Sequence, residues 1–331
     1  MADVSVSLDR EDADAARDED RAQIILITGL TLAVLFVAVV LLLNTVIYTE
    51  NLATRGADAG GTEAIEFRDG TVDDLAGILE REHRNGTANA TDSFLASAER
   101  YGRTVSGLRA RDGVVADVRV NDSTVEPGYF FAQDETATGF REMTAPDGTT
   151  TDWTVAGNAT ETRNFRLTVD SSSLSGSVSG AFTVVADGTA AGTNETWSAS
   201  LSDSSGNVSV TVDNGTTTVT ETFAPRPDGN HTVDFTAGTV NGEPFDALVW
   251  AEGVQNESGT APFDIRYENG GEARGTYSFV VDDRDGSSPL SDTSRPYVVE
   301  GIYGVEVDIL HRTPELTYGD VVRLAPGERD A

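Results

Sequence analysis

The 331-residue chain contains no cysteine and only three histidines. The absence of cysteine excludes disulfides, thiolate zinc sites and cysteine nucleophiles. His83, His231 and His311 form no H-x-x-x-H or H-E-x-x-H pair, so the spacing of a histidine metal site is missing. The nucleophile elbow, the P-loop and the glycine-rich dinucleotide loop are absent as well. We therefore expect no metal, no cofactor and no enzymatic activity.

Lysine is also missing: all 23 basic residues are arginine, against 55 acidic residues, and the formal net charge is −32. An acidic surface opposes nucleic-acid binding, because neutralising phosphates requires clustered cations. Disordered chains can be equally acidic, but 38% of these residues are hydrophobic, which allows a buried core. In molar salt the Debye length falls to about 3 Å, so acidic repulsion is screened while the carboxylates keep the surface hydrated. This charge pattern predicts a halophilic archaeal source.

Charge of either sign is absent from the twenty residues Ile24 to Leu43. At 1.5 Å per residue a helix of this length spans about 30 Å, the thickness of the hydrocarbon layer of a bilayer. The apolar core of a secretory signal is shorter and follows a basic region, whereas eight acidic residues and three arginines precede this run. A core helix would show a polar face, and this run has none. We predict a transmembrane helix over residues 23–48, in contact with the lipid bilayer.

The arginines near this helix predict its orientation. Arg10, Arg17 and Arg21 precede it, and only Arg55 follows closely. Because short loops rich in arginine stay on the cytoplasmic side, we expect a single-pass protein of the cell membrane with a cytoplasmic N-terminus and an extracellular C-terminal bulk.

The segment "RAQII", residues 21–25, resembles the start of archaeal type IV pilin-like proteins. The resemblance implies a cut after Arg21 and Ala22 that leaves Gln23 as the new N-terminus. Three features depart from the pattern: the leader is long and acidic, no Glu lies near the fifth position after the cut, and Gly56, Gly60 and Gly61 are expected to interrupt a helix that normally runs on. With the segment "NTVIYTENLATRG", the span also resembles single-pass surface proteins of haloarchaea. An uncut anchor and a processed pilin-like subunit both stay open.

Residues 1–22, before the span, form an acidic cytoplasmic tail or leader. After the span, residues 49–110 are predicted to form a helical juxtamembrane stalk, which a β-rich region follows. In that stalk Thr71 to Asp74 resembles a capping box and begins a helix that ends at Asn85-Gly86, and a second helix begins near Thr91. The expected buried faces are Val72, Leu75, Ile78 and Leu79 in the first helix, and Phe94, Ala98, Tyr101, Val105 and Leu108 in the second.

We predict that residues 111–331 form an extracellular β-rich domain. The segment 207–223 alternates apolar and polar residues around Asn214-Gly215, a strong hairpin signal, and Asp-Gly and Asn-Gly pairs recur through the region. No helical crossovers separate the strands, so a parallel sheet is disfavoured. We predict a mainly β fold, α+β overall, with an antiparallel β-sandwich or meander. The segment 224–229 is a candidate seam, which leaves one or two β domains open.

Nine of the fourteen asparagines begin an Asn-x-Ser/Thr sequon, and all nine follow the span. Chance predicts roughly three, although asparagine and threonine also gather in β-turns. The candidate N-glycosylation sites, which agree with an outside location, are Asn85, Asn89, Asn121, Asn158, Asn194, Asn207, Asn214, Asn230 and Asn256.

Two weaker signals remain. Asp283-x-Asp285-Gly286 is a fragment of a calcium loop, although an acidic turn is the simpler interpretation. Trp153, Trp197 and Trp250 could line a sugar-binding face, although core packing is the stronger expectation.

We predict an envelope protein with a structural or interaction role, whose partners are other envelope or pilin-like proteins. The alternatives are the pilin-like subunit and a membrane-tethered hydrolase that uses two of the many carboxylates.

Overall fold

The computed structural model describes residues 8–85, 90–137, 139–189, 195–254, 261–282 and 296–328. The chain forms two compact units, Met1–Glu63 and Ala64–Ala331. In the described part of the first unit the backbone is entirely helical. The second unit holds every described strand, so residues 64–110, which the sequence assigned to a stalk, belong to the same unit as the β-sheets.

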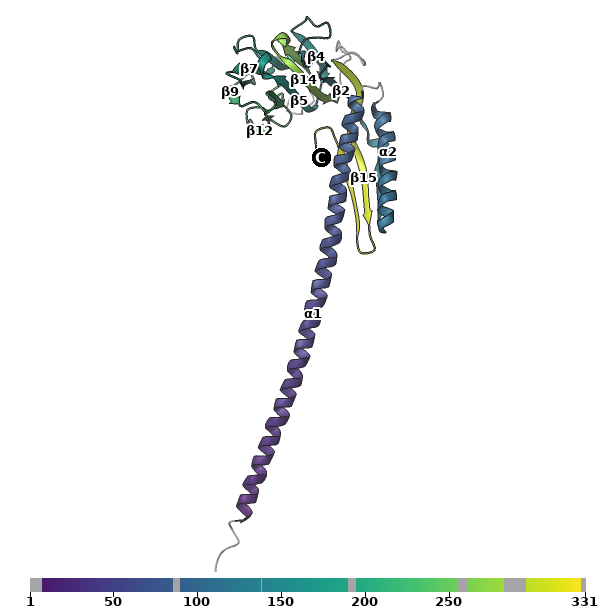
Figure 1. Cartoon of the computed structure of the whole chain (residues 1–331), viewed down its shortest axis with the longest axis vertical. Helices are drawn as coiled ribbons and strands as arrows, with labels where there is room; N and C mark the ends of the chain where they lie inside the picture. Colours follow the sequence, from purple (N-terminus) through teal and green to yellow (C-terminus); the bar gives the residue numbers. More distant parts are fainter. Residues whose placement is uncertain are drawn as a thin grey trace, which may run out of the picture. The chain divides into compact units, whose positions relative to one another are not determined.

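One helix, α1 (Leu8–Arg84), runs for 77 residues from the N-terminal region into the second unit (Figure 1). The predicted interruption at Gly56, Gly60 and Gly61 is wrong, because the helix continues through all three. A glycine inside a helix costs only about 1 kcal/mol relative to alanine, so isolated glycines weaken a long helix without ending it. The helix expected to begin near Thr71 is therefore the last part of α1, and it ends at Arg84, next to the predicted Asn85-Gly86 stop.

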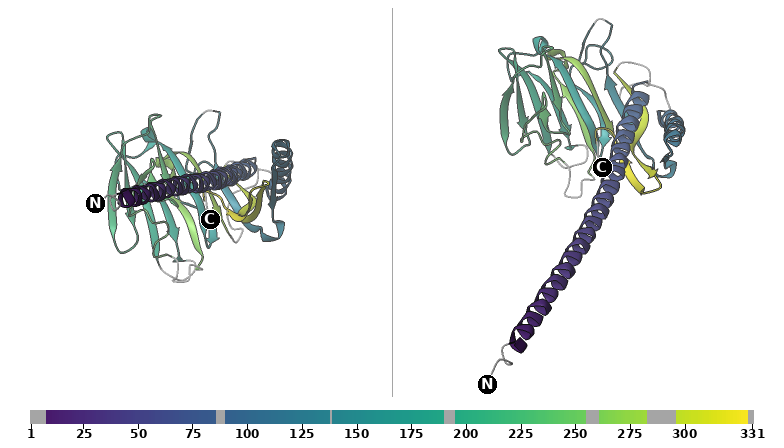
Figure 2. Two further views of the ribbon diagram at one scale, coloured as in Figure 1. Left: turned by 90° about the horizontal axis from the view of Figure 1, so that it is seen from below. Right: turned by 60° about the horizontal axis from the view of Figure 1, so that its bottom comes forward.

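The second unit contains two antiparallel sheets, which confirms the predicted fold class (Figure 2). The larger sheet has the order β1-β15-β2-β14-β5-β10-β11-β12, with β16 on β15 and β3 on β14; the smaller sheet has the order β4-β13-β6-β7-β8-β9. The strands of the larger sheet are β1 (Val115–Val120), β2 (Glu126–Gln133), β3 (Arg141–Glu142), β5 (Thr162–Asp170), β10 (Asn230–Asp234), β11 (Thr239–Val240), β12 (Glu243–Pro244), β14 (Arg274–Val281), β15 (Tyr297–Arg312) and β16 (Thr317–Leu324). Those of the smaller sheet are β4 (Trp153–Ala159), β6 (Phe182–Asp187), β7 (Thr196–Ser204), β8 (Asn207–Asp213), β9 (Thr218–Phe223) and β13 (Phe263–Glu268).

A single aromatic-rich core joins strands of both sheets. Trp197, Phe165 and Phe279 are completely buried in it, and the centroids of their rings lie 4.7–6.1 Å from those of further aromatic rings. The candidate seam at 224–229 is the connection from β9 of the smaller sheet to β10 of the larger sheet. Because both strands bury side chains in the same core, the two sheets form one sandwich.

The two halves of the long strand β15 pair with different strands. Its first half, from Tyr297 to Gly304, pairs with β2 inside the sandwich, and its second half lies between β1 and β16. The register shifts between Ile302 and Gly304, where the two halves meet. Together with β1 and β16, the second half of β15 forms a three-stranded extension of the larger sheet, and this extension needs a cover on at least one face.

The end of α1 and the helix α2 (Ala90–Arg109) supply that cover. Of the residues predicted to face inward, Val72, Leu75, Leu79, Phe94 and Ala98 are buried against β1, β15 and β16. Ile78, Tyr101 and Val105 are partly buried and pack against the same core. Leu108, in the last turn of α2, is 52% exposed. Helical periodicity thus predicted which side chains face a partner, and the partner is the sheet.

Candidate functional site

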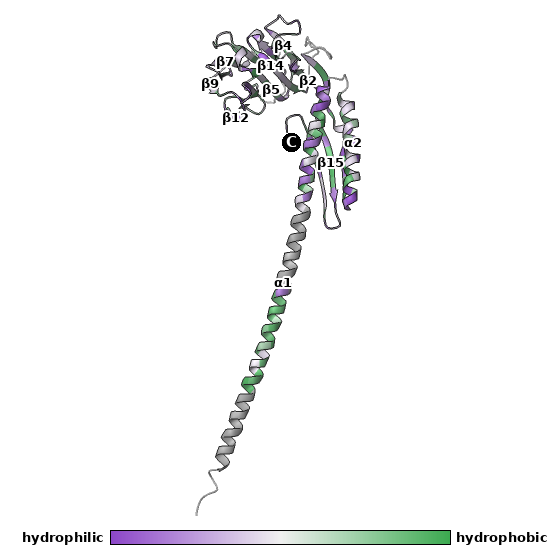
Figure 3. Ribbon diagram, in the orientation of Figure 1, coloured by the Kyte–Doolittle hydropathy of each residue, from purple (hydrophilic) through white to green (hydrophobic). Residues whose placement is uncertain are grey.

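The apolar segment of α1 is the first functional feature. Ile24–Asn44 is a hydrophobic stretch of α1 (Figure 3) that is long and apolar enough to cross a membrane. None of it is buried against protein. A segment of this kind close to the N-terminus serves as a membrane anchor or as a signal sequence. Its threonines are compatible with lipid, because the hydroxyl groups of Thr28 and Thr31 donate hydrogen bonds to helix carbonyls four residues earlier, at 2.7 and 2.8 Å. This segment lies within the span predicted over residues 23–48.

The candidate processing residues Arg21, Ala22 and Gln23 lie within α1, directly before the apolar segment. Their backbone is helical, and their side chains lie outside the described part of the structure. The peptide bond in question therefore joins the acidic and the apolar stretches of one helix.

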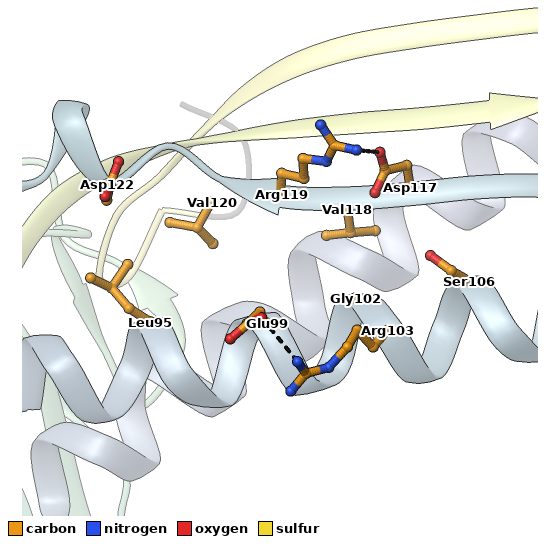
Figure 4. Close-up of a pocket in the computed structure, with 10 residues that line it drawn as sticks. All are labelled: Leu95, Glu99, Gly102, Arg103, Ser106, Asp117, Val118, Arg119, Val120 and Asp122. Carbon is orange, nitrogen blue, oxygen red and sulfur yellow. Dashed lines mark hydrogen bonds and ion pairs between the residues drawn. The ribbon is translucent and has the colours of Figure 1, made fainter.

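A groove of about 760 Å³ lies between α2 and β1 (Figure 4). Its floor is apolar and is formed by Leu95, Val118 and Val120, which belong to the helix–sheet core or pack against it. Gly102 permits the close contact between α2 and β1 at this groove, because a β-carbon at this position would lie 2.5 Å from the carbonyl oxygen of Val118. Helix and strand therefore approach each other at backbone distance.

Two ion pairs border this groove. Arg103 Nη1 lies 2.9 Å from Glu99 Oε1 on α2, and Arg119 Nη2 lies 2.7 Å from Asp117 Oδ2 on β1. These side chains are exposed or partly exposed, so each pair stabilises the fold by at most about 1 kcal/mol. Ser106 is the hydroxyl residue among the ten that line the groove, and no histidine lies among them to act as its base.

The carboxyl groups were candidates for the hydrolase alternative, which requires an acid with a raised pKa. Those whose pKa departs from its ordinary value in the described residues all depart downward: Glu82, Asp147, Asp187, Asp228 and Asp320. At Asp187 burial acts to raise the pKa, but hydrogen bonds from Thr189 and Arg266 outweigh it and lower the pKa. These carboxylates are therefore held ionised by local partners.

The three histidines remain apart in the fold. His83 lies against β15, His231 is buried beside Asn241, and His311 packs 5.5 Å from the ring of Phe67. Within the described ranges no group of three or more histidine, aspartate or glutamate side chains could hold a metal ion. The calcium-loop fragment with Asp283 and Asp285 lies outside these ranges.

The asparagines of six of the nine sequons lie in the described part of the chain. None of their asparagines is buried; they are Asn85, Asn121, Asn158, Asn207, Asn214 and Asn230. They differ in how freely the side-chain amide could carry a glycan. The amide nitrogen of Asn214 donates to Glu252 Oε2 at 2.8 Å, and the side-chain oxygen of Asn121 accepts the backbone N–H of Ser123. Asn89, Asn194 and Asn256 lie outside the described residues.

The three tryptophans have different surroundings. Trp153 and Trp197 are buried in the sandwich core, as expected, with 6% and 0% of their surface exposed. Trp250 is only partly buried, and it lines a separate cleft with Arg163 and Asn164. Sequence reasoning missed that cleft, because its walls come from segments up to about 160 residues apart and no local pattern connects them.

Comparison with known protein families matches about half of the chain to one family model. Residues 18–187, just over half of the chain, match a family described as being of unknown function (DUF7261). No curated protein and no solved structure matches the chain.

Proposed function

The chain belongs to this family of unknown function, DUF7261, and we propose that it is a surface protein of the archaeal cell envelope. In this proposal Ile24–Asn44 anchors it in the cell membrane, the acidic N-terminus stays in the cytoplasm and the sandwich lies outside. Its role is structural or in binding other envelope proteins. The acidic, lysine-free composition supports a halophilic source, and the sequons support glycosylation of the sandwich.

The observation that carries this proposal is the continuity of α1. One unbroken helix includes an apolar segment without protein contacts and, from Ala64 onward, a stripe of side chains packed on a β-sheet. An apolar helix face that no protein covers favours a lipid environment. A signal sequence would be removed, whereas here the helix that holds the apolar segment is also part of the folded unit.

We expect the C-terminus to be accessible from outside intact cells and the N-terminus to be protected. The test places one epitope tag before Met1 and another after Ala331, in a halophilic host, and adds protease to intact cells in molar salt. Loss of the C-terminal tag with survival of the N-terminal tag is the expected result, and lysed cells serve as the control in which both are lost. Protection of the C-terminal tag, or release of the protein from membranes by alkaline carbonate, would contradict the proposal.

A pilin-like subunit is the second candidate, and the same helix favours it. Pilin-like assembly needs a helix that runs on beyond the apolar segment, and α1 continues through the three glycines that were expected to stop it. In this form the chain is cut between Ala22 and Gln23, and the apolar helices of neighbouring copies pack together.

Intact-mass measurement of the protein from its native membrane distinguishes these two forms. A processed subunit lacks residues 1–22, and an uncut anchor retains them. We expect Arg21→Gln to block the cut and the matched variant Arg17→Gln, which lies in the leader but outside the motif, to leave it unchanged. A wild-type mass that includes the first 22 residues rules out the pilin-like form and leaves the plain anchor.

A further inference from the structure

The smaller sheet of the sandwich ends in an open strand, β9. Among the described strands its neighbour is β8, and the two pair over six consecutive residues without a shift of register. Figure 1 shows β9 at the margin of the second unit that lies far from α2. Val219 of β9 lies opposite the buried Val212 and is still 42% exposed, so the core of the sandwich does not enclose this strand.

The other ends of the two sheets are protected against pairing with another chain. α2 packs against β1, β3 and β12 have two residues each, and the pairing of β4 with β13 is shifted at two points. On β16 the carboxylate of Asp320 accepts the N–H of Val321 at 2.9 Å. β9 has no proline and no bulge, and Glu221 is its one charged residue. Because proteins usually protect regular edge strands, one that stays open favours pairing with another chain.

The hydrogen bonds of the β8–β9 hairpin show which backbone groups point to the open edge. The N–H of Asn214 donates to the carbonyl of Thr217 at 3.2 Å, which closes the loop. From this pair onward every second residue of β9 exchanges backbone hydrogen bonds with β8, namely Val219, Glu221 and Phe223. The N–H and C=O groups of the residues between them therefore point away from β8; these residues are Thr218, Thr220 and Thr222.

Contacts between side chains support this alternation. In an antiparallel pair the side chains approach most closely where the backbones are not bonded to each other. The hydroxyl groups of Thr220 and Thr211 lie 2.9 Å apart, and those of Thr222 and Ser209 lie 2.8 Å apart. The open edge of β9 therefore presents three N–H donors and three C=O acceptors at regular spacing.

The outer face of the sheet beside this edge carries few charges. Hydroxyl side chains dominate this face over β7, β8 and β9, at Ser198, Ser200, Ser202, Ser209, Thr211, Asp213, Thr218, Thr220 and Thr222. Asp213 is the one acid among them. The whole chain has a formal net charge of −32, so copies of it repel each other. This repulsion is weakest where acids are few, so a second copy can approach closely here.

We infer that β9 pairs in antiparallel fashion with β9 of a second copy and joins the two smaller sheets into one continuous sheet. A strand edge is complementary to itself under a two-fold rotation, as this pairing requires. With the axis at Thr220, that residue faces its own copy and Thr218 faces Thr222 of the second copy. About six backbone hydrogen bonds then form, within the range of typical interfaces.

The position of Glu221 selects this register. With the axis at Thr220, Glu221 lies opposite Val219 of the second copy, whereas an axis at Glu221 would place two carboxylates directly opposite each other. The inference names a partner for the second unit alone. It does not depend on membrane anchoring or on processing at Gln23.

A single introduced cysteine tests the pairing, because the chain has no cysteine of its own. In the inferred register the two Thr220 Cα atoms lie about 5.5 Å apart, which a disulfide can bridge. We expect Thr220→Cys, in the full chain in detergent and molar salt, to form a disulfide-linked dimer under mild oxidation. The matched control Thr211→Cys lies on the same face one strand further in, about 14 Å from its copy, and should form the dimer at least tenfold more slowly. Equal rates for the two variants, or no dimer with Thr220→Cys, would overturn the inference.

A mixture of two further variants tests the register. Thr218→Cys and Thr222→Cys should each stay monomeric on a non-reducing gel, because neither residue faces its own copy. When the two proteins are mixed and oxidised, a linked dimer that contains one of each is expected. Linking in either variant alone to the same extent as in the mixture would show that the copies meet by random collision, and the inferred pairing would be wrong.

Discussion

Replacing Gly102 by alanine is expected to lower the free energy of unfolding by about 2–3 kcal/mol, the cost of overpacking a tight core. The added β-carbon would lie 2.5 Å from the carbonyl oxygen of Val118. That oxygen cannot turn away easily, because it belongs to β1, which is paired with β15 over six residues. The helix must therefore move outward and lose part of its contact with the sheet.

The hydrogen-bond pattern explains why α2 approaches so closely at this point. The N–H of Asn121 donates to the carbonyl of Glu306 at 2.9 Å, which sets the alternation along the antiparallel pair. In an antiparallel pair every second residue bonds to the partner strand, so the backbone N–H and C=O groups of Arg119 and Asp117 bond to β15 as those of Asn121 do. The carbonyl of Val118, which lies between them, therefore points away from β15. Because β1 has no other strand partner among the described strands, α2 covers its open edge, which protects it from pairing with other chains.

Gly107 provides the matched control in the same helix. No atom lies within 4 Å of the position of its missing β-carbon. Gly107→Ala should therefore raise the free energy of unfolding by up to about 1 kcal/mol, because alanine favours the helix. Denaturant unfolding of both variants in molar salt measures the contrast. Equal shifts in the same direction would show that the close contact at Gly102 does not exist.

Acidification is expected to destabilise the junction between α1 and β15 by up to about 3 kcal/mol through one histidine. His83 is 1% exposed, its Nε2 accepts the N–H of Ile302 at 3.1 Å, and its ring stacks 5.1 Å from Phe130. Burial, with a smaller contribution from the charge of Arg84, lowers its pKa to about 4. Protonation would place a charge in this site and remove the acceptor that Ile302 uses.

The direction of the effect follows from the two pKa values. In the unfolded chain the pKa of a histidine is about 6.5, so between pH 6.5 and 4 the unfolded state binds the proton more readily. The contribution of neutral His83 is complete above pH 6.5, falls by about 1.4 kcal/mol per pH unit as the pH drops, and is lost below pH 4.

Chemical unfolding at a series of pH values checks this expectation in the wild type and in His83→Gln. The glutamine keeps an acceptor oxygen but does not titrate, so its stability should vary less between pH 6.5 and 4.5. His231, whose pKa burial also lowers, is present in both proteins and cancels in the comparison. Identical pH profiles for the two proteins would show that His83 is not the titrating group.

Prediction from the sequence succeeded where the signal is local. The inward-facing side chains of α1 and α2 follow from helical spacing, and the hairpin between β8 and β9 follows from Asn214-Gly215, because neighbouring residues alone decide these features. It failed at Gly56, Gly60 and Gly61, where a local helix-breaking tendency was expected to decide the outcome. Three small penalties did not end a helix of 77 residues.

By itself, the sequence determined the apolar segment of α1, the excess of acid over base, the sequons and the antiparallel β class. Each depends on composition or on spacing along a few residues. Only the tertiary structure decided that β15 serves both the sandwich and its helix-covered extension, and that Gly102 seats α2 on the edge of β1. It also decided that Trp250 is partly buried and borders a cleft, while Trp153 and Trp197 are buried in the core. These features join segments far apart in the chain, and their positions depend on how two sheets and two helices pack, which no local pattern records.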